Sequence, residues 1–260
     1  MMITTDDGTE LYAELSGADD LPVVMFSNSL GTSLELWDDQ MAAFSGRFRI
    51  LRYDDRGHGR SSAPAGPYTL DRLGRDVIAV LDGLGIDKVD WVGLSKGGML
   101  GMWLATNAPE RVGKLVLADT SAHMPTPEMW AERAETAREK GLAAMAPATL
   151  ERWFTEPFRA ANPDVIERIR AIILATSVEG YAGSCEAIGG MDQRETIRAI
   201  TAPTLVVVGE QDPGTPVSHA EAIVAAIPGA RLAVLADAAH LSNVEQAAAF
   251  NETVLSFLTA

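Results

Sequence analysis

The chain contains, at residues 91–98, the sequence Trp91-Val92-Gly93-Leu94-Ser95-Lys96-Gly97-Gly98. The pattern Gly-x-Ser-x-Gly, centred on Ser95, lies between an apolar segment that predicts a strand and one that predicts a helix. A serine on so tight a turn has strained backbone, and the glycines leave room for the neighbouring strand and helix. The turn also places Ser95 at a helix amino end, which stabilises developing negative charge. The stretch predicts a nucleophilic serine; the alternative is an ordinary strand–helix turn.

A serine nucleophile requires a base, because its hydroxyl is hardly ionised near pH 7, and imidazole titrates in a suitable range. His240 follows one predicted strand near the end of the chain, and Asp212 follows the strand before it. A carboxylate on the second imidazole nitrogen would hold His240 in one tautomer. Asp212 is the preferred acid, and Glu210 and Asp237 remain alternatives.

The other three histidines have less suitable positions. His58 lies in an Arg-Gly-His-Gly-Arg turn, which predicts a structural loop that packs near the site. His123 and His219 are predicted to be exposed or to face the helical segment described next. None of the histidines forms an H-x-x-x-H pair, so we expect no metal site and no cofactor.

Alternating strand and helix patterns predict an α/β fold with a mostly parallel central sheet covered by helices on both faces. Residues 9–15 alternate in hydropathy and predict an edge strand. The pattern is interrupted by a helical segment, residues 123–198, which we call the insertion. The core is therefore predicted in two parts, 1–122 and 199–260, with the insertion as a cap. Its helices are predicted at 128–140, 148–154, 163–176 and 179–189.

An oxyanion formed at the serine would require two backbone N–H donors. One is predicted from Lys96, the residue after Ser95, and the other from Leu30 in the loop after the strand that ends at Ser27.

The composition and net charge of the chain limit the classes of molecule that it could bind. A net charge of −15, from 21 basic and 36 acidic side chains, argues against binding to nucleic acid or anionic membranes. An anionic substrate would then require a local cation. No apolar run is long enough to span a membrane. A single cysteine, Cys185, and an amino end without a basic or apolar leader predict a cytoplasmic protein. Oligomeric state is not predicted.

Motifs across nearly the whole chain resemble the α/β-hydrolase superfamily and, within it, the family of 3-oxoadipate enol-lactonases. The superfamily features are the serine turn, the order Ser95, Asp212, His240, and the loop Asp54-x-Arg56-Gly57-His58-Gly59. The narrower features are the stretches Ser27–Thr32, Gly66–Thr69, Arg152–Thr155, Gly180-Tyr181 and His240–Gln246.

This resemblance implies a serine hydrolase of carboxylic ester bonds. The implied reaction opens a small anionic enol-lactone to 3-oxoadipate in the β-ketoadipate pathway of aromatic catabolism. It would use a Ser-His-Asp acyl-enzyme mechanism and no cofactor. The insertion resembles the cap of such enzymes. Arg133, one helical turn after Trp130, is predicted to meet the substrate carboxylate, and Trp130 or Trp153 to form a wall of the pocket. Alternatively, Arg133 is a solvated helix residue and the tryptophans belong to the cap core.

Lys96 departs from the family, in which methionine is usual after the nucleophile. Three placements of its side chain remain open. The ammonium could reach water without a role, attract an anionic substrate or change specificity, or block the pocket.

Two other functions remain as alternatives. One is a carboxylesterase or lactonase for a neutral ester, and the other is a non-catalytic binding protein with a hydrolase fold. A haloalkane dehalogenase is disfavoured, because its nucleophile at this turn is aspartate rather than the Ser95 found here.

Overall fold

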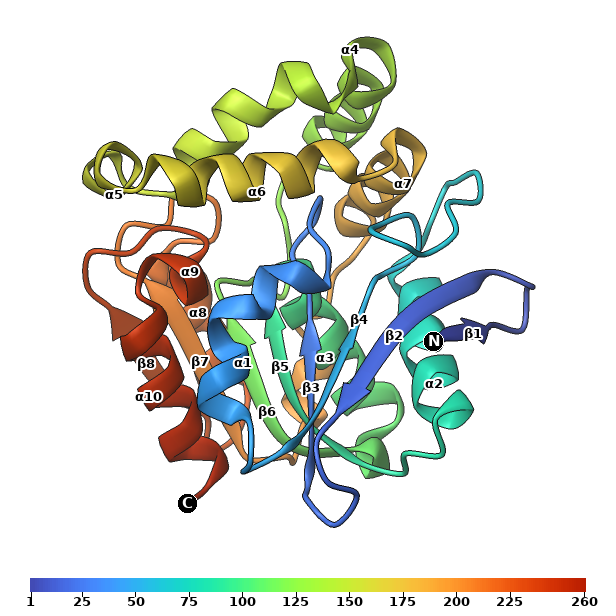
Figure 1. Ribbon diagram of the computed structural model, residues 1–260, viewed down its shortest axis with the longest axis vertical. Helices are drawn as coiled ribbons and strands as arrows, with labels where there is room; N and C mark the ends of the chain where they lie inside the picture. Colours follow the sequence, from blue (N-terminus) through green and yellow to red (C-terminus); the bar gives the residue numbers. More distant parts are fainter.

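An eight-stranded sheet forms the centre of the computed structural model, which describes residues 1–260. The strand order is β1-β2-β4-β3-β5-β6-β7-β8 (Figure 1). β3 to β8 are parallel, whereas β1 and β2 are antiparallel to their neighbours. The predicted α/β fold is therefore confirmed. The strands are β1 Met2–Thr4, β2 Glu10–Ser16, β3 Val23–Ser27, β4 Arg49–Tyr53, β5 Val89–Leu94, β6 Val112–Ala118, β7 Thr204–Gly209 and β8 Arg231–Leu235.

The prediction that residues 9–15 form an edge strand is wrong. β2 lies between β1 and β4, and the three-residue strand β1 takes the edge. The central parallel strands are buried on both faces, as continuous apolar runs predict.

Helices cover both faces of the sheet. α1 (Asp38–Phe44) and α10 (Ala247–Leu258) lie in front of the sheet in Figure 1. α2 (Leu70–Gly83), α3 (Lys96–Asn107) and α8 (Val217–Ala226) lie behind it. The short helices are η1 Leu34–Trp37, η2 Pro109–Arg111, η3 Thr196–Ala199 and α9 Ser242–Glu245. No helix combines the length and the apolar character that crossing a membrane requires.

The insertion lies across the carboxyl ends of the parallel strands (Figure 1). It contains α4 (Pro127–Trp153), α5 (Glu156–Ala161), α6 (Pro163–Ala175) and α7 (Val178–Gly189). Two helices were predicted in the range of α4, and the chain does break there, at Gly141 with φ 71°. α5 was not predicted. Buried apolar side chains form one continuous cluster from the sheet into the insertion, so the insertion packs on the core.

Candidate active site

Ser95 occupies the turn between β5 and α3 with φ 56° and ψ −114°, a backbone region that most residues avoid. A Cβ atom at Gly93 would lie 2.2 Å from the Gly97 carbonyl oxygen, and one at Gly97 would lie 2.1 Å from that of Ser27. Both glycines are thus required by close backbone packing, as the sequence predicts. The turn directs Ser95 toward the insertion.

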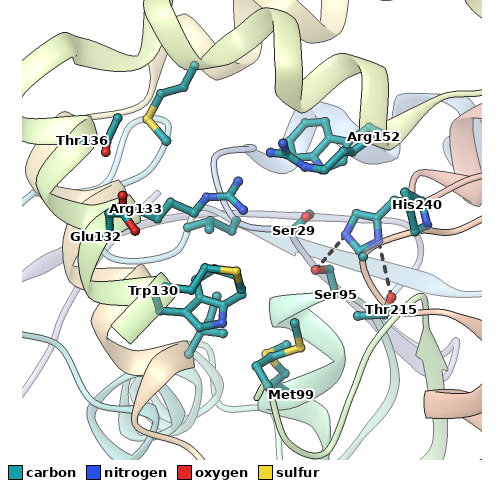
Figure 2. Close-up of a pocket in the computed structure, with 18 residues that line it drawn as sticks. Ser29, Ser95, Met99, Trp130, Glu132, Arg133, Thr136, Arg152, Thr215 and His240 are labelled. Atoms are coloured by element: carbon teal, nitrogen blue, oxygen red, sulfur yellow. Dashed lines mark hydrogen bonds between the residues drawn. The ribbon is translucent and has the colours of Figure 1, made fainter. Parts of the chain in front are cut away.

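The structure brings Ser95, His240 and Asp212 into one hydrogen-bonded chain from the ends of three strands. His240 Nε2 lies 3.0 Å from Ser95 Oγ (Figure 2), and His240 Nδ1 lies 2.8 Å from Asp212 Oδ2. All three residues are buried. The alternative acids, Glu210 and Asp237, are exposed and make no hydrogen bond to His240.

Four hydrogen bonds stabilise the Asp212 carboxylate. The Gly214 and Thr215 amides donate to Oδ1 at 2.8 and 3.0 Å, and the Thr215 hydroxyl donates to Oδ2 at 2.6 Å, beside the His240 contact. Burial alone would raise the pKa of Asp212, but the charge and hydrogen bonds of His240 and Thr215 lower it to about 2. The ionised carboxylate fixes the proton on His240 Nδ1, which leaves Nε2 to accept from the serine hydroxyl.

Asp212 in turn raises the pKa of His240. Burial alone would lower the pKa of His240, but the adjacent Asp212 charge and hydrogen bond raise it above the ordinary imidazole value.

Two backbone donors lie beside the serine. Leu30 follows β3, and Lys96 is the first residue of α3. Neither backbone N–H has an acceptor in the protein. A free amide at a helix amino end, such as that of Lys96, is suited to hold an anion. The assignment of Leu30 and Lys96 as oxyanion donors stays a prediction.

A cavity of about 500 Å³ lies between these groups and the insertion. Ser95, His240 and Leu30 line it from the core, whereas Trp130 and Arg133 line it from α4. Figure 2 shows Arg133 reaching into the cavity from one side, with Ser95 and His240 on the other. The cavity is large enough for a small organic molecule.

All three substrate-contact residues predicted from the sequence line this cavity. The Trp153 ring is stacked with the imidazole of His240, with ring centroids 6.4 Å apart. The Arg133 guanidinium lies over the Trp130 ring at 5.3 Å, and its Nε donates to the Tyr181 hydroxyl at 2.7 Å.

A second arginine, Arg152, also lines the cavity and was missed in the sequence. Neither Arg133 nor Arg152 forms an ion pair with a carboxylate, unlike many other arginines of the chain. Burial, followed by the charge of Arg133, lowers the pKa of Arg152. Nothing in the local sequence distinguishes Arg152 from a solvated helix residue, because cavity residues such as Arg133 and His240 lie far from it in the sequence.

Two further polar groups in the cavity have no partner in the protein. They are the hydroxyl of Ser29, which is 1% exposed, and the indole N–H of Trp130. Buried polar groups usually form hydrogen bonds, so these two are exceptions.

Asp119 is a buried carboxyl that the sequence analysis did not single out. It follows β6, and it accepts hydrogen bonds from the Gly209 amide at 2.7 Å and from the Ser242 hydroxyl. It therefore links the segments that carry Asp212 and His240. Burial and the nearby Asp212 charge raise the pKa of Asp119 to about 8. The sequence pattern that identified Asp212 also applies to Asp119, because Asp119 is a polar residue at the carboxyl end of a buried strand.

The remaining histidines lie outside the cavity. His58 is buried, and its Nε2 accepts the Gly31 N–H at 3.1 Å, so it packs near the site as predicted. His123 contacts the Met191 carbonyl, at the end of the insertion. His219 is half-buried on α8.

Two of the placements considered for the Lys96 side chain are wrong, because its ammonium neither reaches water nor blocks the pocket, whereas an effect on specificity stays a prediction. The side chain is fully buried, is absent from the cavity lining, and has its ammonium 3.4 Å from Asp55 Oδ2. No group of three or more His, Cys, Asp or Glu side chains is arranged to hold a metal ion.

Comparisons with known proteins show which family the chain is similar to. Residues 22–247 match the family model described as alpha/beta hydrolase fold. The chain is 42% identical to 3-oxoadipate enol-lactonase 2 of Acinetobacter baylyi over 97% of this chain and 94% of the relative. It is 35% identical to 3-oxoadipate enol-lactonase 1 of the same organism, over 99% and 96%. It also resembles the crystal structure of the enol-lactonase from Burkholderia xenovorans, with 42% identity, a TM-score of 0.97 and 100% of both chains covered.

Proposed function

The chain belongs to the α/β-hydrolase family as a hydrolase of ester bonds, and we propose that its substrate is 3-oxoadipate enol-lactone. Two relatives and one structural neighbour named as enol-lactonases support this substrate. The product would be 3-oxoadipate, an intermediate of the β-ketoadipate pathway.

The observation that carries the proposal is the pair of arginines in the cavity. In a protein with net charge −15, Arg133 and Arg152 face the same cavity as Ser95, and their side chains bond to the hydroxyls of Tyr181 and Thr149 rather than to a carboxylate. A substrate carboxylate would supply an ionic partner, and guanidinium groups suit carboxylates because they can donate two parallel hydrogen bonds.

The reaction proceeds by acyl transfer. Ser95 attacks the lactone carbonyl carbon while His240 Nε2 accepts the hydroxyl proton. Asp212 holds the imidazole and stabilises its charged form. The Leu30 and Lys96 amides hold the oxyanion, and removal of one such donor costs about 3 kcal/mol in comparable enzymes.

Collapse of the tetrahedral intermediate breaks the ring ester bond while protonated His240 gives its proton to the leaving enol oxygen. The enol stays attached to the acyl group and becomes a ketone, and His240 is neutral again. Water, activated by His240, then hydrolyses the acyl-enzyme. The insertion acts as a cap over this chemistry. Trp130 and Trp153 form apolar walls that limit access of bulk water, which strengthens the electrostatic contacts inside.

The test is direct assay of the purified protein with the enol-lactone, with Ser95→Ala as the inactive control. A Ser95→Ala variant that retains full activity contradicts the mechanism. Covalent labelling of Ser95 by a fluorophosphonate excludes the non-catalytic alternative.

A neutral ester is the second candidate, because methionines also line the cavity. They are Met99, Met124, Met129 and Met145. Comparison of kcat/KM for the enol-lactone with that for p-nitrophenyl acetate separates the two substrates. A higher value for the neutral ester favours the second candidate.

The arginines give the sharper test of substrate charge. We expect Arg133→Gln and Arg152→Gln each to raise KM for the lactone about 10-fold or more, because a charged hydrogen bond contributes roughly 1.5–3 kcal/mol. The same variants leave kcat/KM for p-nitrophenyl acetate unchanged. Equal effects on both substrates would contradict a carboxylate contact.

A further inference from the structure

The side chain of Lys96 extends away from the cavity into the protein. Its ammonium is fully buried and lies 3.4 Å from the carboxylate of Asp55, which is 2% exposed. The ammonium forms no hydrogen bond in the protein, and the Asp55 carboxylate is its only ionic partner. Lys96 and Asp55 thus form a buried ion pair directly behind the turn that carries Ser95.

Asp55 also contacts the loop that carries the second oxyanion donor. Its Oδ2 accepts from Asn28 Nδ2 at 3.4 Å, and Asn28 stands two residues before Leu30. Its Oδ1 accepts from the Tyr53 hydroxyl at 3.0 Å, and that hydroxyl lies 3.0 Å from Ser27 Oγ at the end of β3. One carboxylate therefore connects the segments of both donors.

Asn28 is held firmly enough to transmit this connection. Its Nδ2 donates to the Tyr53 carbonyl at 2.6 Å, and its Oδ1 accepts the Trp37 indole N–H at 3.0 Å. Because its hydrogen bonds come from several elements, the position of the Leu30 loop depends on the network that Asp55 completes.

We propose that the Lys96 side chain is a positioning residue: its ion pair with Asp55 fixes the separation between the Leu30 and Lys96 backbone donors around the oxyanion. This rests on the proposed acyl transfer at Ser95 and not on the identity of the lactone. Lys96 thereby acts twice, with its amide as donor and its ammonium as anchor.

A buried ion pair contributes little to the stability of the fold, but it can hold two segments in one geometry. Removing two charges from water is costly, so two neutral side chains in the same place would make the fold about as stable. The pair instead imposes one geometry. Displacement of a catalytic group by about 1 Å can lower the rate about 100-fold, so we expect loss of the anchor to lower kcat by about 10- to 100-fold.

The test compares Lys96→Met, Asp55→Asn and the double variant. Each single variant leaves one buried group without its partner, and we expect it to lower both Tm and kcat. The double variant removes both charges, so we expect Tm to return toward that of the wild type while kcat stays at least about 10-fold low and KM changes little. A double variant with wild-type kcat would overturn the proposal, because the pair would then be only structural.

The readouts are p-nitrophenyl acetate hydrolysis and the rate of fluorophosphonate labelling, which do not depend on the lactone. If the wild type turns over this ester but not the lactone, the proposed substrate fails and the positioning role is still tested. If the wild type reacts with neither reagent, both proposals fall.

A control away from the cavity is the double variant Arg111→Met and Asp82→Asn, which removes an ion pair between Arg111, 15% exposed, and the exposed Asp82. We expect it to lower Tm without changing kcat. A similar loss of kcat in this control would also overturn the proposal, because kcat would then follow stability.

Discussion

His240 must be neutral to accept the Ser95 proton, so its titration sets the pH dependence of the proposed reaction. Asp212 raises the pKa of His240 above the ordinary value, and protonation at low pH blocks the base. We therefore expect kcat/KM to rise with pH along a limb whose midpoint lies above about 6.5. The measurement is the pH profile with a neutral p-nitrophenyl ester, which does not titrate itself.

Asp212→Asn provides the matched comparison. Loss of the carboxylate removes the charge that raises the pKa of His240, so the limb moves to lower pH. The plateau value of kcat/KM at high pH falls about 10⁴-fold, because the imidazole loses its correct tautomer. A limb that stays in place in this variant would contradict the assignment of Asp212.

The three residues of the hydrogen-bonded chain could be predicted because each carries a local signal. Ser95 lies in a glycine-bounded turn, and Asp212 and His240 each directly follow an apolar strand. The Lys96 side chain carries no such signal. Its burial depends on Asp55, which comes from a different strand end, and a sequence pattern does not show which distant carboxylate a lysine meets.

At the scale of elements, long periodic segments could be predicted from the sequence, whereas short ones could not. β1 has three residues and α5 has six, so neither shows a full period of hydropathy. β2 was predicted to be an edge strand because β1, which pairs with it at the true edge, is too short to be recognised in the sequence.

The contact between α7 and the core gives a prediction at this scale. A Cβ atom at Gly180 would lie 2.1 Å from the Gly57 carbonyl oxygen and 2.3 Å from its Cα. Alanine in a helix is favoured over glycine by about 1 kcal/mol, whereas overpacking against rigid backbone costs about 1–3 kcal/mol. We expect the clash to dominate, so Gly180→Ala lowers the free energy of unfolding, measured by urea denaturation.

Gly190→Ala is the matched control at the end of the same helix. Its Cβ would lie 3.4 Å from the nearest atom, and the backbone there has φ −90°, so alanine fits. Equal stabilities of the two variants would contradict the close approach of α7 to the core.

For the whole molecule, the alternation of strands and helices was sufficient to predict the architecture, and the carboxyl ends of parallel strands are where such sheets bind ligands. The resemblance to enol-lactonases is confirmed by relatives that cover nearly the full chain. The cavity itself could not be predicted, because its lining combines α4 with loops from both parts of the core.

Net charge and the two cavity arginines act in opposite directions on an anionic substrate. The −15 charge repels it at long range, whereas Arg133 and Arg152 attract it locally. Raising ionic strength from about 0.01 to about 0.1 M shortens the screening length from about 30 to about 10 Å. In the wild type, salt weakens both effects, so the net dependence of kcat/KM is small.

The double variant Arg133→Gln and Arg152→Gln isolates the repulsion. We expect its kcat/KM for the enol-lactone to increase with salt over that range, because screening removes the barrier that the acidic surface imposes. Hydrolysis of p-nitrophenyl acetate by the same variant provides the control and stays independent of salt. A variant whose lactone turnover is also independent of salt would contradict long-range repulsion, and the local arginines would then be sufficient to explain capture of the substrate.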